Sequence, residues 1–318
     1  MAINREIGLS IIVCNYNASL ENILLTLASC IRQKECNFEV VYCDDGSTNS
    51  FEKEIKEYFQ KRDFKDYVMA CSKENHGTLI NLTNGLKVAK YKYCKTIGCG
   101  DLFYDELSLK RVIDKFEQHQ SDIVITNSCY FFDDEKEIKT FAVRNPIDIK
   151  PYCDKTYNPE TIKKRLLLNE DLILGASVYA NTEYLLDLYT KFIGKIKYTE
   201  DALIVYAALF GAKINYVENY CVYYEYGTGI STSGQSEFQK IIQKECEQLY
   251  DYMSTLDISK KYLKYLKNRK KIRNSSGLKA VLLKLFVTPS QISIKLKSKR
   301  VKKEKPSFEF YKQCKEDR

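Results

Sequence analysis

Two runs of polar residues near the start of the chain contain the side chains best suited to ligand chemistry. Residues 15–17 follow an apolar stretch at 9–13, and residues 44–47 follow a largely apolar stretch at 38–43. The amide and carboxylate oxygens of these runs can bind the polar groups of a ligand. The simpler interpretation of residues 44–47, Asp-Asp-Gly-Ser, is a plain turn, because these residue types favour turns.

The chain between the two runs has the pattern of a single helix. Apolar residues recur there at helical spacing from Leu20 to Ile31, and Ser19 is a residue type that caps helix starts. A strand, a helix and a second strand predict a β-α-β unit. Short apolar strands are typical of a parallel sheet buried on both faces, where ligands bind beyond the carboxyl ends of the strands. Both polar runs are therefore expected at the binding edge.

The same alternation of strand and helix patterns continues downstream. Strands are predicted at 67–71, 93–97, 123–126 and 213–217 and through Tyr223, and helices at 51–59, 79–89, 107–116, 181–192, 202–209, 238–256 and 262–266. Residues 130–159 are polar and irregular, and periodicity is lost beyond Asn274. Glu200 and Asp201 open a predicted helix, where plain capping is the simplest interpretation because the helix dipole favours acids.

Cysteine and histidine usage argues against several classes of site. The 12 Cys contain no CxxC pair and the two His lie far apart, so neither a zinc site nor histidine-based catalysis is expected. No signal peptide precedes the cysteines, which predicts reduced thiols in a cytoplasmic protein.

The net charge of +8 is distributed unevenly. Residues 260–305 contain 17 Lys/Arg and a single acid, Glu304, whereas residues 1–259 contain 30 Lys/Arg and 38 Asp/Glu. A basic tail can meet nucleic acid, an anionic membrane or only water. Nucleic acid is ranked low because no aromatic stacking platform accompanies the tail. No apolar run reaches the roughly 20 residues of a membrane span, so none is expected.

The order of motifs resembles the family 2 glycosyltransferases with the GT-A fold. The resemblance covers roughly residues 8–235 and rests on Ser10 to Asn17, Phe38 to Ser47, Asn75-His76-Gly77 with Asn84-Gly85, the loop ending at Asp101, the pair Glu200-Asp201 and the glycine-rich segment 226–234. It implies an α/β fold, a Rossmann-like nucleotide-binding mixed sheet flanked by helices, with a C-terminal helical extension. We expect a GT-A domain at 1–235 (nucleotide half 1–101, acceptor half 102–235), a helical region at 236–275 and a basic tail at 276–318.

The resemblance also implies a role for each candidate residue. Asp201 would be the general base of an inverting displacement, and Glu200 would orient it or the acceptor. Asp101 would be the metal ligand. The donor nucleotide would be held by Cys14, Asn15, Tyr16, Asn17, Asp44, Asp45, Asn75, Gly77 and Gly100. Residues 226–232 would close over the donor and exclude water.

The chemistry implied by the resemblance explains why carboxylates are needed at three places. A divalent cation, Mn²⁺ or Mg²⁺, bound by carboxylate oxygens would stabilise the diphosphate that leaves a nucleotide sugar. A base must take the proton of the acceptor hydroxyl. A third carboxylate can accept a hydrogen bond from the nucleobase, which favours a UDP-linked donor.

Two positions depart from the pattern of the family. The loop that usually reads Asp-x-Asp or Asp-Asp has only Asp101, so the donor phosphates would supply most of the metal coordination. An Arg often found after Asn-x-Gly is replaced by Leu82, so Lys73 or Lys95 would have to meet the phosphate charge. Because this loop has a single carboxylate for a metal, a second hypothesis stays open, in which the chain is a non-catalytic protein that binds a nucleotide sugar or glycan.

The expected partners follow from the family and the tail. The acceptor would be a growing surface glycan on a lipid carrier, with a protein-linked glycan as the alternative. The basic tail would attach the protein to the inner face of the cell membrane as a peripheral protein, the alternative being a solvated extension. The apolar side of the predicted helix 238–256 would pack against the rest of the same chain. A homodimer through the C-terminal helices is the less favoured interpretation.

Overall fold

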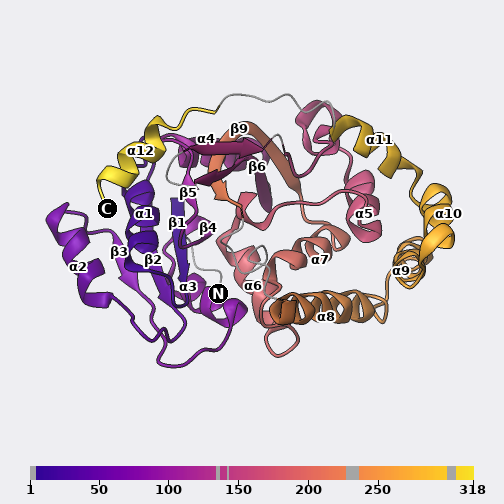
Figure 1. The fold of residues 1–318 in the computed structure, drawn as a ribbon, viewed down its shortest axis with the longest axis horizontal. Coiled ribbons are helices and arrows are strands. Elements are labelled where there is room, and N and C mark those ends of the chain that lie inside the picture. Colours follow the sequence, from indigo (N-terminus) through magenta and orange to yellow (C-terminus); the bar gives the residue numbers. More distant parts are fainter. Residues whose placement is uncertain (1–4, 134–136, 142, 227–235, 299–305) are drawn as a thin grey trace.

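The structure is a computed structural model that describes residues 5–133, 137–141, 143–226, 236–298 and 306–318 (Figure 1). Within these residues nine strands form one sheet in the order β3-β2-β1-β4-β8-β6-β9-β5, with β7 paired to β6. The strands are β1 (Glu6–Asn15), β2 (Phe38–Asp44), β3 (Tyr67–Met69), β4 (Tyr91–Gly98), β5 (Leu102–Phe103), β6 (Ile123–Asp133), β7 (Ile138–Phe141), β8 (Val178–Asn181) and β9 (Ile214–Glu225).

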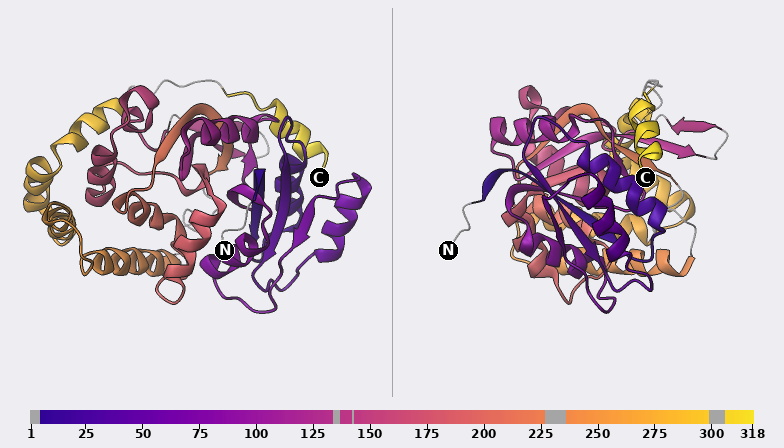
Figure 2. Two further views of the ribbon diagram at one scale, coloured as in Figure 1. Left: turned by 180° about the vertical axis from the view of Figure 1, so that it is seen from behind. Right: turned by 90° about the vertical axis from the view of Figure 1, so that its left-hand side faces the viewer.

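Helices cover both faces of the sheet, as Figures 1 and 2 show. They are α1 (Leu20–Ile31), α2 (Glu52–Lys61), α3 (Thr78–Val88), α4 (Ser108–His119), α5 (Pro159–Leu168), α6 (Thr182–Phe192), α7 (Leu203–Leu209), α8 (Ser236–Met253), α9 (Lys260–Arg273), α10 (Gly277–Val287), α11 (Pro289–Ser298) and α12 (Glu309–Glu316). The sheet with C-terminal helices confirms the predicted fold class.

Strand β1 lies between β2 and β4 and pairs in parallel with both. Its side chains alternate between two hydrophobic cores: Ile12 packs with α3 and α6 on one face, and Ile11 and Val13 pack with α1 and α4 on the other. Both faces are therefore buried, as the apolar sequence predicts. The register sets Asn15 opposite Asp44, which brings the two polar runs to one edge of the sheet.

Three segments differ from the sequence-based expectations. Strand β6 continues to Asp133 and pairs with β7, inside the region expected to be irregular, because aromatic residues at 130–132 extend the strand. The two strands expected around Glu218 are one strand, β9. A register shift between Thr126 and Asn127 accommodates the polar residues at 218 and 219 there. Beyond Asn274 the chain forms α10, α11 and α12, although no helix was predicted there.

The C-terminal helices divide into two groups. Helices α8 to α11 run along the side of the molecule away from β1, whereas α12 returns to pack on α1 (Figure 1). Tyr311 and Cys314 of α12 are buried in the core that contains α1. No single helix in the described residues has the length and apolar composition to cross a membrane. The pair Gly277–Val287 and Pro289–Ser298 meets that test only jointly, across a bend of 92°.

Candidate active site

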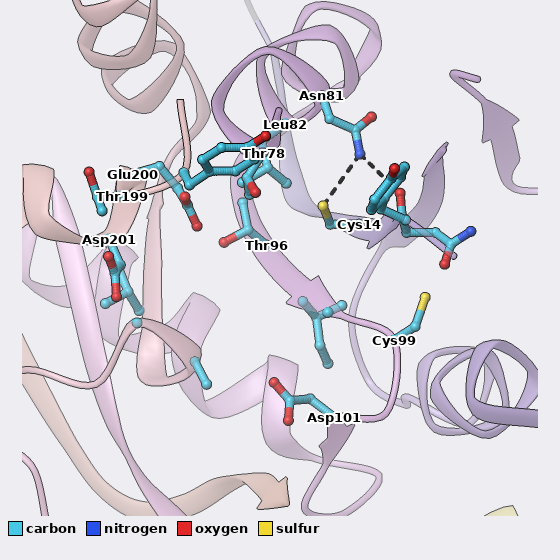
Figure 3. A pocket seen from close by; sticks show the side chains of 18 of the residues that line it. Cys14, Thr78, Asn81, Leu82, Thr96, Cys99, Asp101, Thr199, Glu200 and Asp201 are labelled. Carbon is cyan, nitrogen blue, oxygen red and sulfur yellow. Dashed lines mark hydrogen bonds between the residues drawn. The ribbon is translucent and has the colours of Figure 1, made fainter. Parts of the chain in front are cut away.

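A pocket of ≈ 660 Å³ lies at the carboxyl ends of β1 and β4. Its wall includes most of the residues singled out from the sequence: Cys14, Asn15, Tyr16, Asn17, Asp45, Gly100, Asp101, Glu200 and Asp201. Asp44, Asn75 and Gly77 do not line it. Figure 3 shows Asp101 and the Glu200-Asp201 pair on different walls of the same cavity. The fold therefore gathers groups from segments as much as 187 positions apart in the chain, between Cys14 and Asp201.

Asp44 holds the turn that follows β1. Its Oδ2 accepts a hydrogen bond from Asn15 Nδ2 at 2.5 Å, and its Oδ1 accepts one from the Ser47 backbone N–H at 2.8 Å. Ser47 Oγ in turn accepts from the Asn17 N–H at 2.7 Å. Asp44 is 1% exposed and does not line the pocket, so its carboxylate shapes the binding loop from behind. The donor-binding role expected for it stays a prediction.

Asp45 binds the segment that leads into α3. Its two oxygens accept hydrogen bonds from the backbone N–H groups of His76 at 2.9 Å and Gly77 at 2.8 Å. Gly77 has φ of 92°, a conformation that favours glycine. Asp45 thus fixes the backbone that leads into α3. Asn75 and Gly77 do not line the pocket, and the donor-binding role expected for them stays a prediction.

Asn81 on α3 is a pocket residue that the sequence reasoning missed. Its Nδ2 donates to Cys14 Sγ at 3.3 Å (Figure 3) and to the Cys43 carbonyl at 3.2 Å. Its Oδ1 is buried without a hydrogen-bond partner among the described residues. Asn81 lies one helical turn after Gly77, the N-cap of α3. This spacing could have indicated that its side chain lies on the same side of the helix start as the binding loop. A buried amide oxygen that lines a pocket is suited to accept a hydrogen bond from a ligand.

The loop after β4 places Asp101 on the pocket wall. Gly100 has φ of 108°, its N–H donates to Thr26 Oγ1 at 2.9 Å, and the Thr26 hydroxyl donates to the Asp101 carbonyl at 2.9 Å. Thr26 therefore ties α1 to both residues. Removal from bulk water raises the pKa of Asp101 to about 7, with Lys95 opposing this shift and Glu225 adding to it.

Lys95 is fully buried beneath this loop. Its Nζ donates to the carbonyls of Thr96, Ala176 and Val178 at 2.8, 2.7 and 3.2 Å, and burial lowers its pKa to about 8. All three donor positions of the ammonium group are thereby used. The expectation that Lys95 meets donor phosphates is therefore wrong: it joins β4 to the segment before β8. Lys73, the other candidate, is exposed and does not line the pocket.

Glu200 and Asp201 form a carboxylate pair in the short 3-10 helix η4 (Glu200–Ala202), and Ala202, not either acid, is the N-cap of α7. Oε2 of Glu200 is buried with no hydrogen-bond partner in the described chain. Burial, together with the adjacent charge of Asp201, raises the pKa of Glu200 to about 8, and burial raises the pKa of Asp201 as well. The pair can therefore hold or take up a proton near neutral pH.

Two neighbours fix the position of this pair. Glu245 of α8 accepts hydrogen bonds from the Lys197 N–H (3.0 Å), the Tyr198 N–H (2.9 Å) and the Thr199 hydroxyl (3.1 Å). Gly175 lies against the side chain of Asp201, because a Cβ at this glycine would stand 2.8 Å from Asp201 Cβ. The backbone before the pair and the space beside it are thus both set by packing.

A divalent cation can be tested against these residues. The described residues contain no group of three His, Cys, Asp or Glu side chains able to hold a metal ion. Asp101 is a partly buried carboxylate on the pocket wall whose charge is disfavoured by removal from bulk water, and Mg²⁺ often takes one or two carboxylates plus substrate phosphates. The site therefore fits a cation carried in with a diphosphate rather than one held by protein alone.

The comparisons with known proteins agree with this geometry. The family model described as Glycosyl transferase family 2 matches residues 10–170. A stretch of 100 residues is 40% identical to a chondroitin synthase of Pasteurella multocida (strain Pm70); the match covers 30% of this chain and 10% of that protein.

Solved structures show a similar fold along nearly the whole chain. S. aureus TarS 1-349 in complex with UDP-GlcNAc aligns with a TM-score of 0.58 at 17% identity, covering 97% of this chain and 90% of that one. The same TarS fragment in complex with UDP aligns with a TM-score of 0.54 at 16% identity and the same coverage.

Proposed function

The chain belongs to glycosyl transferase family 2, and we propose that it transfers a sugar from a UDP-sugar to a hydroxyl group of a growing surface glycan. The observation that carries this proposal is that Asp45, Asp101 and the Glu200-Asp201 pair line one pocket. Asp45 would serve the nucleoside, Asp101 the diphosphate, and the pair the transfer of the proton. The presence of UDP-GlcNAc and UDP in the TarS structures supports a uridine nucleotide as the donor.

The nucleoside would bind at the turn after β1. Tyr16 is 49% exposed at the pocket wall, so its ring is available to stack on the base. Asp45 keeps further lone pairs beyond its two backbone hydrogen bonds. The unpaired Oδ1 of Asn81 provides an additional acceptor nearby.

The diphosphate would lie beside Asp101. This carboxylate would hold a Mn²⁺ or Mg²⁺ ion, which when bound neutralises the charge of the leaving diphosphate. Gly100, next to it, has a positive φ and no side chain, so the backbone can approach the phosphates closely.

Transfer would proceed at the Glu200-Asp201 wall. Asp201 takes the proton of the acceptor hydroxyl as its oxygen bonds to the anomeric carbon, and the bond from that carbon to the diphosphate oxygen breaks. One displacement of this kind inverts the configuration at the anomeric carbon. Glu200, in its protonated form, donates a hydrogen bond that orients Asp201 or the acceptor.

The acceptor would be a lipid-linked glycan, and the enzyme would work at the cytoplasmic face of the cell membrane. The excess of Lys and Arg in the C-terminal part of the chain supports this location. Of residues 226–232, expected to close over the donor, all but Tyr226 lie outside the described residues.

A panel of nucleotide sugars tests the donor, because slow hydrolysis releases UDP without an acceptor. We expect release with one UDP-sugar in the presence of Mn²⁺ or Mg²⁺, and loss of release in Asp201→Asn. UDP binding without release from any sugar, with or without glycan acceptors, would contradict the proposal. Lipid-linked and protein-linked glycans, added in parallel, then distinguish the two acceptor classes.

A further inference from the structure

Helix α10 carries an uncovered apolar face. Its exposed large side chains recur at positions i, i+3, i+4, i+7 and i+8, which lie on one side of a helix. They are Leu278 (75% exposed), Val281 (54%), Leu282 (45%), Leu285 (46%) and Phe286 (83%). We call these five residues the α10 face. The remaining apolar residues of the helix, Ala280, Leu283 and Val287, are half-buried, so one side of α10 is packed and the other is bare.

The α10 face is held outward by its neighbours. Helix α10 packs on α9 and α11. Helix α11 is joined to the body by Lys297, whose Nζ lies 2.6 Å from Asp148 Oδ2, and by Gln291, which donates to the Asn169 carbonyl at 3.4 Å. In Figure 1 α9, α10 and α11 occupy the edge of the molecule opposite α2. The α10 face therefore has a fixed place on the outer surface.

Lysines lie along both borders of this face. With 100° per residue, Lys279 and Lys284 project on opposite sides of the arc formed by the five apolar residues. Both are exposed. Residues 260–298, which form α9, α10 and α11, contain 12 Lys/Arg and no Asp or Glu. Such lysines can reach anionic headgroups while the apolar side chains enter the lipid.

This combination selects an anionic bilayer among the candidate occupants. Two copies of the α10 face would bring lysines against lysines with no acid between them, which disfavours a second copy of the chain. A transmembrane span through α10 and α11 would require the 92° bend to straighten and the pair between Lys297 and Asp148 to break. A surface contact requires neither change.

We propose that the α10 face docks the protein on an anionic lipid surface, with Leu278, Leu285 and Phe286 inserted between headgroups and Lys279 and Lys284 bound to lipid phosphates. The proposal rests on the surface of α10 and not on the identity of the donor, so its test is separable from that of glycosyl transfer.

Co-sedimentation of the full chain with vesicles measures this docking. We expect binding to vesicles that contain phosphatidylglycerol, little binding to phosphatidylcholine alone, and release in about 0.5 M salt, where charges are screened within a few Å. Lys279→Gln with Lys284→Gln should weaken binding about 25-fold, and Phe286→Ala should weaken it about tenfold.

Matched variants elsewhere provide the control. Lys61→Gln with Lys87→Gln removes the same charge from the exposed surfaces of α2 and α3, and Phe210→Ala removes an aromatic ring that is 51% exposed. Both should bind vesicles as the parent chain does, and all variants should keep acceptor-independent UDP release. Equal binding by the α10 variants and the controls, equal binding to neutral vesicles, or resistance to alkaline carbonate extraction would overturn the proposal.

Discussion

The two adjacent acidic pairs, Asp44-Asp45 and Glu200-Asp201, differ in how their oxygens are used. All four carboxylate oxygens of the first pair accept a hydrogen bond, three of them from backbone N–H groups. In the second pair Oε2 of Glu200 is buried without a partner among the described residues, and the pKa of both acids is raised. The first pair builds the loop that carries the ligand, and the second is left free to exchange protons.

The comparison shows why acidic residues in one pocket cannot be given equal roles. Hydrogen bonds from backbone N–H groups hold the carboxylates of Asp44 and Asp45 in place. An acid that lacks such bonds costs stability but retains an oxygen for a substrate. Substitutions in the two pairs should therefore separate stability from catalysis.

The largest expected effect is on turnover when the second pair is changed. Asp201→Asn should lower kcat about 10³-fold, because the acceptor hydroxyl loses its base, while UDP affinity measured by calorimetry stays the same. The urea midpoint should not fall, because the substitution removes a carboxylate whose charged form the folded protein disfavours. A variant that keeps its turnover would show that Asp201 is not the base.

The first pair should respond in stability. Asp45→Ala leaves the N–H groups of His76 and Gly77 without their acceptor and should lower the free energy of unfolding by about 2–4 kcal/mol, measured in urea. The donor KM should rise more than kcat falls. Asp257→Ala, whose side chain is exposed, is the control and should change neither quantity. An unaltered urea midpoint in Asp45→Ala would remove the distinction between the pairs.

Glu245 of α8 holds residues 197–199, just before the second pair, so its substitution tests whether the position of the pair matters for turnover. Glu245→Gln should lower kcat about tenfold, because one of its backbone contacts is lost and the pair shifts. It should also move the alkaline limb of the pH profile to lower pH, because the charge of Glu245 contributes to the raised pKa of Glu200, which acts in its protonated form. Other titratable groups that face the pair are Cys14, Tyr189 and Cys246.

The control for this change is Glu247→Gln on the same helix. Glu247 pairs with Arg273 at 2.8 Å and forms none of the hydrogen bonds that Glu245 accepts from residues 197–199. It should leave the pH profile in place. If both variants shift the profile equally, net charge rather than position explains the effect.

The smallest effect concerns the pH dependence of stability. The pKa of Glu200 in the folded protein is raised from 4.5 to about 8, so the stability contributed by its protonated form is complete below pH 4.5 and is lost as the pH rises toward 8. Glu200→Gln should therefore match the parent in thermal midpoint at low pH and exceed it above pH 8. A constant difference at every pH would mean that Glu200 does not titrate in this range.

The sequence predicted the framework of the site well where local pattern and position in the sheet agree. The apolar run at 9–13 and the turn residues after it indicated β1 and its binding edge, because parallel strands of this kind present ligands at their carboxyl ends. The sequence could not distinguish Asp44 from Asp45, since the direction of a side chain depends on backbone angles within the turn. The two acids differ in the structure because Asp44 accepts a hydrogen bond from Asn15, whereas Asp45 accepts one from the Gly77 N–H.

Other parts of the site depended on contacts between distant segments. Lys95 appeared to be a free cation, but it is enclosed by carbonyls of residues 176 and 178, about 80 positions away. Glu245 appeared only as one residue of an amphipathic helix, and its acceptor role needs the segment 197–199 beside it. Such contacts follow from tertiary packing and leave no periodic trace in the sequence.

The packing of α12 on α1 has a consequence for biosynthesis. Arg32, next to α1, pairs with Asp317, which lies 285 positions further along the chain. On the ribosome, α1 and Thr26, which supports the loop of Asp101, emerge long before Tyr311 and Cys314 can complete the core around them. The donor side of the pocket therefore cannot finish folding during early translation, and exposed α1 is the segment on which we expect a chaperone to act.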